Sequence, residues 1–257
     1  MTQTERLLYL IQYLLNENRE LQPLEIPVKD MERKRLLRSL MNVRPPRPIY
    51  KEFSEVQGAY LKEELREKGT VSLADLSAKE PGIYLWQGDI TRLSVDAIVN
   101  AANSALLGCF VPCHGCIDNA IHSAAGVELR LECSRIMERQ KSKEPAGKAK
   151  ITKAYHLPCR YVLHTVGPII QGDLTNRDCD LLSDCYRSCL ELAAEYHLKS
   201  IAFCCISTGE FHFPNEKAAE IAVHTVREYQ KKNPDGMEVI FNVFKDRDYN
   251  IYQKLLG

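Results

Sequence analysis

The feature that most constrains the fold is a continuous apolar run in the C-terminal third of the chain. Residues 200–206, SIAFCCI, contain no charged side chain and only one hydroxyl group. A strand covered by helices on both faces has this composition, because neither of its sides meets water. A strand with one solvated face would alternate between apolar and polar residues instead. The run therefore predicts a sheet with helices packed on both faces.

Strand and helix patterns alternate on either side of this run. Beta-rich segments occur at residues 83–87, 96–101, 150–157, 160–166, 200–206 and 238–244. Helical spacing of apolar side chains occurs at residues 120–139, 179–197, 215–231 and 249–256. Such alternation is typical of domains in which helices connect parallel strands. We therefore predict a three-layer α/β/α domain with a mostly parallel central sheet.

The N-terminal segment differs in character from the rest of the chain. It shows helical spacing of apolar residues and no strand pattern over residues 5–17, 28–43 and 49–67. The second of these segments stops at the proline cluster PPRP, because proline cannot continue a helix. We predict a small all-helical extension at residues 1–70, followed by the α/β domain at residues 71–257. The basic run at residues 33–38 is interpreted as a solvated helix face, with a partner-binding patch as the alternative.

Charge and cysteine content narrow the class of protein. The chain has 34 Lys and Arg against 34 Asp and Glu, so it carries no global field that would attract nucleic acid or a membrane surface. No apolar run approaches the roughly 20 residues of a membrane span. The ten cysteines lack the spacing of a small disulfide framework, and the N-terminus is a poor signal peptide. We expect free thiols and a cytoplasmic protein.

A cluster of soft metal donors lies at residues 107–126, LGCFVPCHGCIDNAIHSAAG. Cys109, Cys113, His114 and Cys116 fall within eight residues of one another. Thiolate and imidazole donors this close together suit zinc. The spacing alone leaves a structural zinc site, a catalytic zinc site and no metal all open, and it also permits Cys113 as a ligand. His122 is interpreted as a buried, hydrogen-bonded helix histidine, and His164 in the same way as a core histidine.

Three polar loops follow predicted strands, at residues 88–90, 100–118 and 207–211. The carboxyl ends of parallel strands meet at one edge of a sheet, and ligands bind there. The carboxylate of Asp89 can accept a hydrogen bond from an exocyclic amine, and Gly209 allows consecutive backbone amides to cradle a phosphate. The alternatives are that Asp89 is a helix cap and that residues 207–211 form an ordinary loop. We hypothesise a nucleotide-like ligand at this edge.

Taken together, five segments resemble a macrodomain, the ADP-ribose-binding fold with a mixed, mostly parallel central sheet. The segments are GDIT, VDAIVNAAN, CIDNAIHSAAG, GKAKITKAYHLPCRYVLHTVGP and CCISTGEFHFP, in the family's order, and the resemblance covers residues 82–257. Hydrolytic macrodomains carry a glycine run before the catalytic aspartate, whereas this chain has CHGCIDNAIH with LGCF upstream. That pattern is similar to the zinc-dependent subgroup, whose members carry an N-terminal helical extension. Some of them are linked in bacterial operons to sirtuin-type ADP-ribosyltransferases.

The resemblance implies a set of site residues. Cys109, His114 and Cys116 would bind one Zn²⁺ per chain, and Cys113 falls on a variable position of the motif. Asp118 and Asn103 would be the catalytic residues at the distal ribose. The implied ADP-ribose contacts are Asp89, Ile90, Asn103, Cys116, Ile117, Asp118, Ser207, Thr208, Gly209, Glu210 and Phe211, with the first two at adenine and the last five around the diphosphate and ribose.

The resemblance also implies an activity. Members of the subgroup release mono-ADP-ribose from modified protein side chains, and some are linked to a lipoylated carrier protein. Three protein ligands leave the fourth zinc position open, as in catalytic sites. Zinc there would polarise an oxygen or lower the pKa of a bound water to about 7. A non-hydrolytic ADP-ribose reader and an O-acetyl-ADP-ribose deacetylase are the alternatives, and a monomer is expected.

Overall fold

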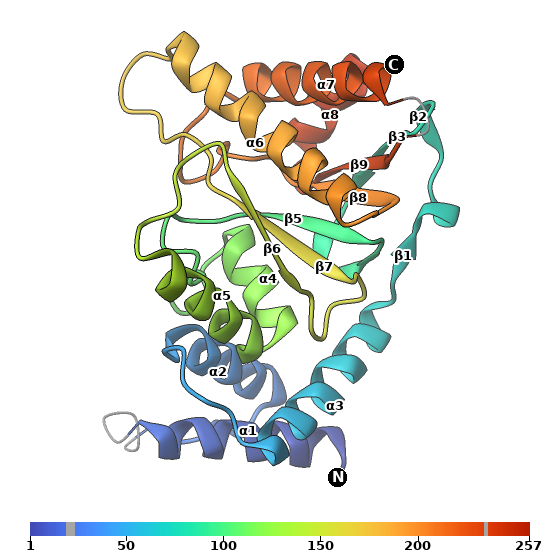
Figure 1. Ribbon diagram of the computed structural model, residues 1–257. Helices are drawn as coiled ribbons and strands as arrows, with labels where there is room; N and C mark the ends of the chain where they lie inside the picture. The colour runs from blue at the N-terminus through green and yellow to red at the C-terminus, as the bar shows by residue number, and fades with distance from the viewer. Residues whose placement is uncertain (19–23, 234–235) are drawn as a thin grey trace.

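A computed structural model describes residues 1–18, 24–233 and 236–257. The chain begins with three helices, which lie together at one end of the molecule (Figure 1): α1 (Gln3–Glu17), α2 (Asp30–Val43) and α3 (Lys51–Lys68). A capping box starts α1, because the Thr2 side chain accepts from the Glu5 amide while the Glu5 carboxylate accepts from the Thr2 amide. Apolar side chains at helical spacing then turn one face of each helix inward.

The three helices share a hydrophobic core that is separate from the core around the sheet. Its buried members are Leu7, Leu10, Ile11, Leu14, Leu15, Leu37, Leu40, Met41, Phe53, Tyr60 and Val127. All but the last come from the helical extension, residues 1–70. Val127 comes from the domain that follows, so this core reaches across the junction between the two parts.

The central sheet has seven strands in the order β2-β3-β9-β8-β5-β7-β6. Its strands are β2 (Ala78–Glu80), β3 (Ile83–Gln87), β5 (Ala97–Ala101), β6 (Ala149–Lys153), β7 (Tyr161–Thr165), β8 (Ser200–Phe203) and β9 (Glu238–Val243). The inner pairs are parallel, and the two outermost pairs, β2–β3 and β6–β7, are antiparallel. A short pair, β1 (Val71–Ser72) and β4 (Leu93–Ser94), lies apart from this sheet. The prediction of a mixed, mostly parallel sheet is confirmed.

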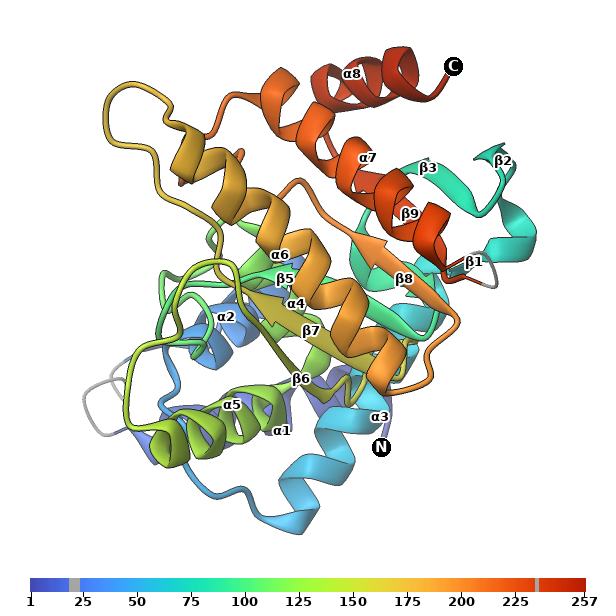
Figure 2. The same ribbon diagram turned by 45° about the horizontal axis from the view of Figure 1, so that its top comes forward.

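Helices cover both faces of the sheet, which confirms the three-layer prediction. One face carries α6 (Asn176–Glu195), α7 (Asn215–Lys232) and α8 (Asp246–Leu256). The other carries α4 (Ile117–Ala125) and α5 (Val127–Gln140), with the helical extension beyond them (Figures 1 and 2). All four residues of β8 are buried, as the apolar run predicts.

One predicted helix is wrong in an informative way. The pattern over residues 120–139 predicts a single helix, but the chain breaks at Gly126, between α4 and α5. Gly126 has a φ of 93°, and a Cβ there would lie 2.8 Å from the Gln57 side chain of α3. A residue with a side chain would be strained in its backbone and would also collide with the extension. The Gln57 side-chain oxygen also accepts from the Val127 amide at 3.1 Å, so the helical extension packs directly on this break.

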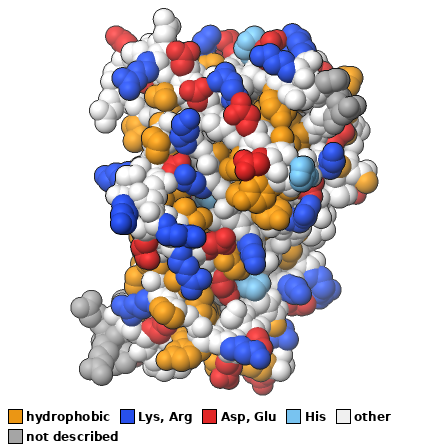
Figure 3. Space-filling view, viewed as in Figure 1, with side chains coloured by type: hydrophobic (Ala, Val, Ile, Leu, Met, Phe, Trp, Pro, Cys, Tyr) orange, Lys and Arg blue, Asp and Glu red, His pale blue; other side chains and the backbone are white. Residues whose placement is uncertain are grey.

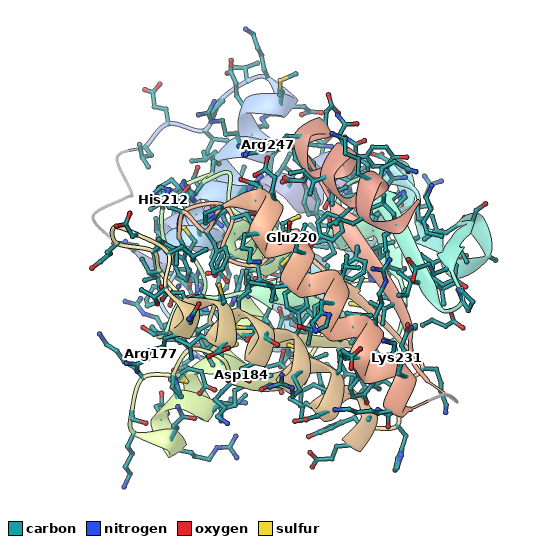
Figure 4. All side chains as sticks on the ribbon, turned by 90° about the horizontal axis from the view of Figure 1, so that it is seen from above. Arg177, Asp184, His212, Glu220, Lys231 and Arg247 are labelled. Atoms are coloured by element: carbon teal, nitrogen blue, oxygen red, sulfur yellow. The ribbon has the colours of Figure 1, made fainter. Side chains whose placement is uncertain are left out.

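The surface mixes charges of both signs. Lys and Arg side chains are interspersed with Asp and Glu over the face seen in Figure 3. On the α6–α7 face, seen in Figure 4, Arg177 and Asp184 lie on α6, and Glu220 and Lys231 lie on α7. All ten cysteines are free. Within the described residues, no helix is both long enough and apolar enough to cross a membrane.

Candidate active site

The loops after parallel strands meet at one edge of the sheet. The chain leaves β5 at Ala101 and reaches α4 at Ile117, and it leaves β8 at Phe203 and reaches α7 at Asn215. Because β5 and β8 are parallel neighbours, both loops start at the same edge. They approach each other where the Nε2 atom of His114 lies 3.7 Å from the Glu210 carboxylate. Two of the three predicted polar loops thus come together.

The first of these loops gathers the predicted metal donors. Cys109, His114 and Cys116, here termed the donor triad, offer ligand atoms that all lie within 4.8 Å of one another. A tetrahedral zinc site with bonds of roughly 2.0–2.3 Å needs ligand atoms roughly 3.3–3.8 Å apart, so a small contraction would complete it. The His114 Nδ1 atom is buried and has no hydrogen-bond partner among the described residues. An imidazole that has an unpartnered buried nitrogen and is grouped with two thiols fits zinc.

The protonation of Cys116 bears on metal binding. Burial raises the pKa of this thiol to about 12, although the Asn119 amide, which donates to its Sγ atom at 3.4 Å, acts in the opposite direction. Cys116 is also the N-cap residue of α4, where the helix dipole favours negative charge. Burial outweighs these opposing effects, so without a metal the Cys116 thiol stays protonated at neutral pH. Zinc binding would displace this proton, as is general for cysteine ligands.

Cys113 lies apart from the donor triad. Its backbone is in the left-handed region, with a φ of 52°. Its Sγ atom lies 3.2 Å from the Ser39 hydroxyl and 3.4 Å from the Arg35 carbonyl oxygen, both on α2. The thiol thus points toward the helical extension. Cys113 is therefore not a member of the donor triad, and the expectation that it is not a ligand stays a prediction.

Asp118 is the buried acid next to the donor triad, in the first turn of α4. Its Oδ1 atom accepts from the Asn100 amide at 2.8 Å, and its Oδ2 atom accepts from the Asn103 amide at 3.3 Å. Burial raises the pKa of Asp118 to about 6, against the opposing effect of these hydrogen bonds and of the Arg130 charge. A carboxyl group with a pKa near neutrality is suited to proton transfer. Asn100, on β5, is a site residue that the sequence did not reveal.

Behind Asp118 lies a second group of histidine and cysteine side chains. His122, Cys133 and His164 are all buried, and their ligand atoms lie within 4.8 Å of one another. Both ring nitrogens of His164 already have neighbours, with Asn100 at 3.1 Å and Thr152 at 2.9 Å. His164 is therefore a satisfied core histidine, as predicted, and this group does not resemble an open metal site.

His122 departs from its prediction in one respect. It is buried in α4, but neither ring nitrogen has a hydrogen-bond partner within the described part of the chain. Its Nε2 atom lies 3.5 Å from the Asp118 carboxylate. Burial lowers the pKa of His122 well below its usual value, so the ring is neutral at pH 7. The ring also packs against Gly108, where a Cβ would lie 2.8 Å from it.

The expected adenine residues follow β3. Asp89 accepts at its Oδ1 atom from the amide and the hydroxyl of Thr91, at 3.0 and 2.6 Å. It thereby caps the short 3₁₀ helix Ile90–Arg92, in which Ile90 is buried. The capping role that the sequence left open is thus present. It occupies one carboxylate oxygen. Asp89 lies at the same sheet edge as the other loops, because β3, β9 and β8 are parallel.

The 207–211 loop combines an unusual backbone with open space. Ser207 is buried with a φ of 66°, and a Cβ on Gly167 would collide with its hydroxyl. A Cβ on Gly209 would meet no heavy atom of the described chain within 4 Å. Phe211 is partly buried against Ala102, Leu106 and Val166. The loop is thus anchored at Ser207 and Phe211 and accessible between them.

Sequence reasoning missed the residues that hold the donor loop, defined here as residues 107–116. Arg38 and Asn42 of α2 bind its backbone, and Arg130 of α5 donates to the Leu107 carbonyl oxygen at 2.6 Å. The interpretation of residues 33–38 as a solvated face is therefore wrong for Arg38. The available signal was weak: Arg38 and Asn42 are four residues apart beside the buried Leu37 and Met41 of α2.

Comparisons with known proteins agree with this architecture. The family model described as Macro domain matches residues 99–222. A Treponema medium protein named Protein-ADP-ribose hydrolase is 57% identical over 261 residues, covering 100% of both chains. A protein of the same name from Staphylococcus aureus (strain MSSA476) is 47% identical, covering 97% of this chain and 94% of its own.

Two solved structures share the fold. The Trypanosoma brucei macrodomain in complex with ADP-ribose has a TM-score of 0.67 and 31% identity, covering 86% of this chain and 95% of its own. The Oceanobacillus iheyensis macrodomain with ADP has a TM-score of 0.62 and 40% identity, covering 68% and 89%. Full-length identity to the bacterial relatives and the shared α/β/α fold lead to one conclusion: this protein belongs to the Macro domain family.

Proposed function

We propose that the protein is a zinc-dependent hydrolase that removes mono-ADP-ribose from modified protein side chains. One observation carries the proposal: the donor triad lies beside the buried carboxyl group of Asp118, which two asparagines hold in place. The names of the two bacterial relatives support the hydrolase activity. The ADP-ribose complex of the Trypanosoma brucei macrodomain supports the ligand.

In this proposal the ligand runs along the sheet edge. Asp89 and Ile90 would contact adenine, and the accessible backbone of the 207–211 loop would hold the diphosphate. Asn103 would orient the distal ribose next to Asp118. The full set of proposed contacts is Asp89, Ile90, Asn103, Cys116, Ile117, Asp118, Ser207, Thr208, Gly209, Glu210 and Phe211.

The reaction would break the bond between the anomeric carbon of the distal ribose and the protein side chain. Water adds to that carbon and loses one proton, and the departing side chain finally takes up that proton. Positive charge develops on the ribose in such reactions, through an oxocarbenium-like transition state. Zinc held by the donor triad would supply Lewis-acid chemistry at the distal ribose. The Asp118 carboxylate would position the water and accept its proton, with Asn100 and Asn103 fixing the orientation of its two oxygens.

The proposal extends to the setting of the reaction. We propose a cytoplasmic monomer, because a reducing compartment would keep the thiols of the donor triad free to bind metal. A mono-ADP-ribosylated lipoylated carrier protein is the substrate to test first. Neither nucleic acid nor a membrane is proposed as a partner, since the net charge is zero.

The test compares release of ADP-ribose from a mono-ADP-ribosylated protein before chelation, after chelation and after zinc is restored. We expect chelation to abolish release and zinc to restore it. The variant His114→Ala should lose both zinc and activity, whereas Asp118→Ala should keep zinc and lose activity by a factor of about 10²–10⁴. Full activity in zinc-free His114→Ala would remove the metal from the mechanism. Binding without release under every condition would favour an ADP-ribose reader.

A further inference from the structure

Arg38 of α2 links the helical extension to the donor loop. Its Nη2 atom donates to the His114 carbonyl oxygen at 3.1 Å. Its Nε and Nη2 atoms both donate to the Asn119 side-chain oxygen, at 3.1 and 2.7 Å. Asn119 in turn donates from its side chain to the Val111 carbonyl oxygen and from its backbone to the Cys116 sulfur. The Arg38 guanidinium thus binds the backbone of His114 directly and reaches Cys116 through Asn119.

Asn42, one turn further along α2, holds the residue before His114. Its side-chain oxygen accepts from the Cys113 amide at 2.9 Å, and its side-chain nitrogen donates to the Ser123 hydroxyl at 2.9 Å. Cys113 is a non-glycine residue with a φ of 52°, a conformation that residues with a side chain rarely adopt. The Asn42 hydrogen bond and the Ser39–Cys113 contact stabilise this turn.

Arg130 holds the donor loop from the other side. Its Nη1 atom donates to the Asn42 and Arg44 carbonyl oxygens at the end of α2, at 2.7 and 2.5 Å. The same guanidinium donates to the carbonyl oxygens of Leu107 and Cys109, at 2.6 and 3.4 Å. It also lies 4.1 Å from the centre of the Phe110 ring. The first ligand of the donor triad is therefore fixed to the same end of α2.

These contacts lead to a role for the helical extension. The donor loop has no helix or strand of its own, so ordering its residues costs backbone entropy that other contacts must offset. We infer that α2 is a positioning element for the metal site: Arg38 and Asn42 hold the donor loop in the conformation that brings Cys109, His114 and Cys116 together. The inference rests on the proposed zinc site and assigns the extension to it.

Zinc affinity tests the inference. Arg38→Ala and Asn42→Ala should each bind zinc about 10–100-fold more weakly than the unaltered protein, the usual effect of losing a group that orients metal ligands. Affinity would be measured by competition with a chromophoric chelator. Arg35→Ala is the matched control, because its side chain is exposed on the same helix and its carbonyl oxygen remains in place. The control should bind zinc normally.

A second measurement needs no metal. Amide hydrogen exchange across residues 107–119 of the metal-free proteins should speed up in Arg38→Ala and Asn42→Ala but not in Arg35→Ala. If Arg38→Ala does not fold, Arg38→Lys replaces it, because lysine keeps the charge and lacks the guanidinium's paired donors. Arg38→Lys should show the same changes to a smaller degree.

The possible results distinguish failure of the inference about α2 from failure of the proposed zinc site. If Arg38→Ala and Asn42→Ala bind zinc normally and exchange normally, while only their unfolding temperatures fall, α2 merely covers the domain and the inference is overturned. If the unaltered protein binds no zinc, the proposed metal chemistry fails. Hydrogen exchange then decides the role of α2: faster exchange supports positioning of the donor loop, and unchanged exchange overturns it.

Discussion

Asn100 shows how a buried amide sets the orientation of a reactive acid. Its side-chain nitrogen lies 2.8 Å from Asp118 and 3.1 Å from His164, in the fully buried interior of β5. His164 stays neutral, because burial lowers its pKa to about 4. Its Nδ1 atom can therefore accept while its Nε2 atom faces Thr152. A chain of contacts that runs from the core through His164 and Asn100 thus fixes the Oδ1 atom of Asp118.

Substitution of Asn100 should separate catalysis from binding. We expect Asn100→Ala to lower kcat for ADP-ribose release by roughly tenfold or more with little change in KM, since about 1.4 kcal/mol of orientation corresponds to a factor of ten. Thr225→Val is the control, because its buried hydroxyl contacts Ser183 and the Ile221 carbonyl oxygen and none of the groups that hold Asp118. Initial rates over a range of substrate concentrations measure both constants. An unchanged kcat in Asn100→Ala would assign Asn100 to stability alone.

Cysteine substitutions test the composition of the donor triad. Cys113→Ser should retain one zinc per chain, because the Cys113 thiol faces Ser39 and the Arg35 carbonyl oxygen. Cys109→Ser and Cys116→Ser should each lose most of the zinc, since a hydroxyl is a poor zinc ligand. Metal content after dialysis, measured by elemental analysis, checks the three variants together. Zinc loss from Cys113→Ser would place that thiol in the coordination sphere.

The sequence identified the donor segment of the candidate site but did not show which distant residues support it. Four soft donors within eight residues are a local signal, so spacing alone identified the segment. Choosing three of the four required the family pattern. Arg38 and Arg130 escaped notice because their contacts to His114 and Asn42 span 76 and 88 residues of sequence. No local pattern encodes contacts at that range.

At the scale of elements, α5 begins where it meets α3. Glu128 accepts from the Ser54 hydroxyl and the Gln57 amide, both at 2.6 Å, and its carboxylate lies 3.6 Å from His156. Burial tends to raise the pKa of Glu128, but the nearby His156 ring and the hydrogen bond from Ser54 outweigh burial and lower it. The ionised carboxylate therefore stabilises the folded junction between the extension and the domain.

This junction should weaken in acid. A lowered pKa in the folded state means that the stabilisation is full above the ordinary pKa of glutamate and is lost as pH falls through the folded-state value. We expect Glu128→Gln to cost about 1–3 kcal/mol at neutral pH and progressively less at acid pH. Urea unfolding of both proteins at several pH values gives this difference. A difference that is constant with pH would contradict the role of the charge.

The order of the elements was predictable because apolar residues recur at helical spacing in each helix and at strand spacing, or as a continuous run, in each strand. The break at Gly126 was not, because IDNAIHSAAGVELRLECS keeps helical spacing on both sides of the glycine. Gly126 permits the break through its positive φ, and the Gln57 side chain, from an element nearly 70 residues earlier, accepts from the Val127 amide at 3.1 Å. This tertiary contact is not visible in the local pattern.

At the scale of the whole molecule, Arg130 joins the helical extension, the donor loop and the domain. It is nearly fully buried, and its donors end on carbonyl oxygens from α2 and from the donor loop. Removing it would leave these oxygens without a charged donor. We expect Arg130→Met to lower the free energy of unfolding by about 3 kcal/mol or more, since hydrogen bonds to charged groups contribute about 1.5–3 kcal/mol each.

Arg130→Lys should recover only a part of that loss, because a single ammonium cannot reach oxygens on both sides of the planar guanidinium. Chemical denaturation of the two variants and the unaltered protein measures the order of stability. Full recovery by lysine would show that charge alone, and not the fork of donors, matters at this position.

Val127 sits in the core of the extension although it belongs to α5, one turn before Arg130. Melting the extension alone would expose Val127 and strip a buried cation of its partners, and melting the domain alone would do the same from the other side. Neither the helical extension nor the α/β domain can therefore unfold alone without a large cost in free energy. Scanning calorimetry should therefore record one heat-absorption peak whose calorimetric and van't Hoff enthalpies agree. Two resolved peaks would show that the extension and the domain unfold as independent units.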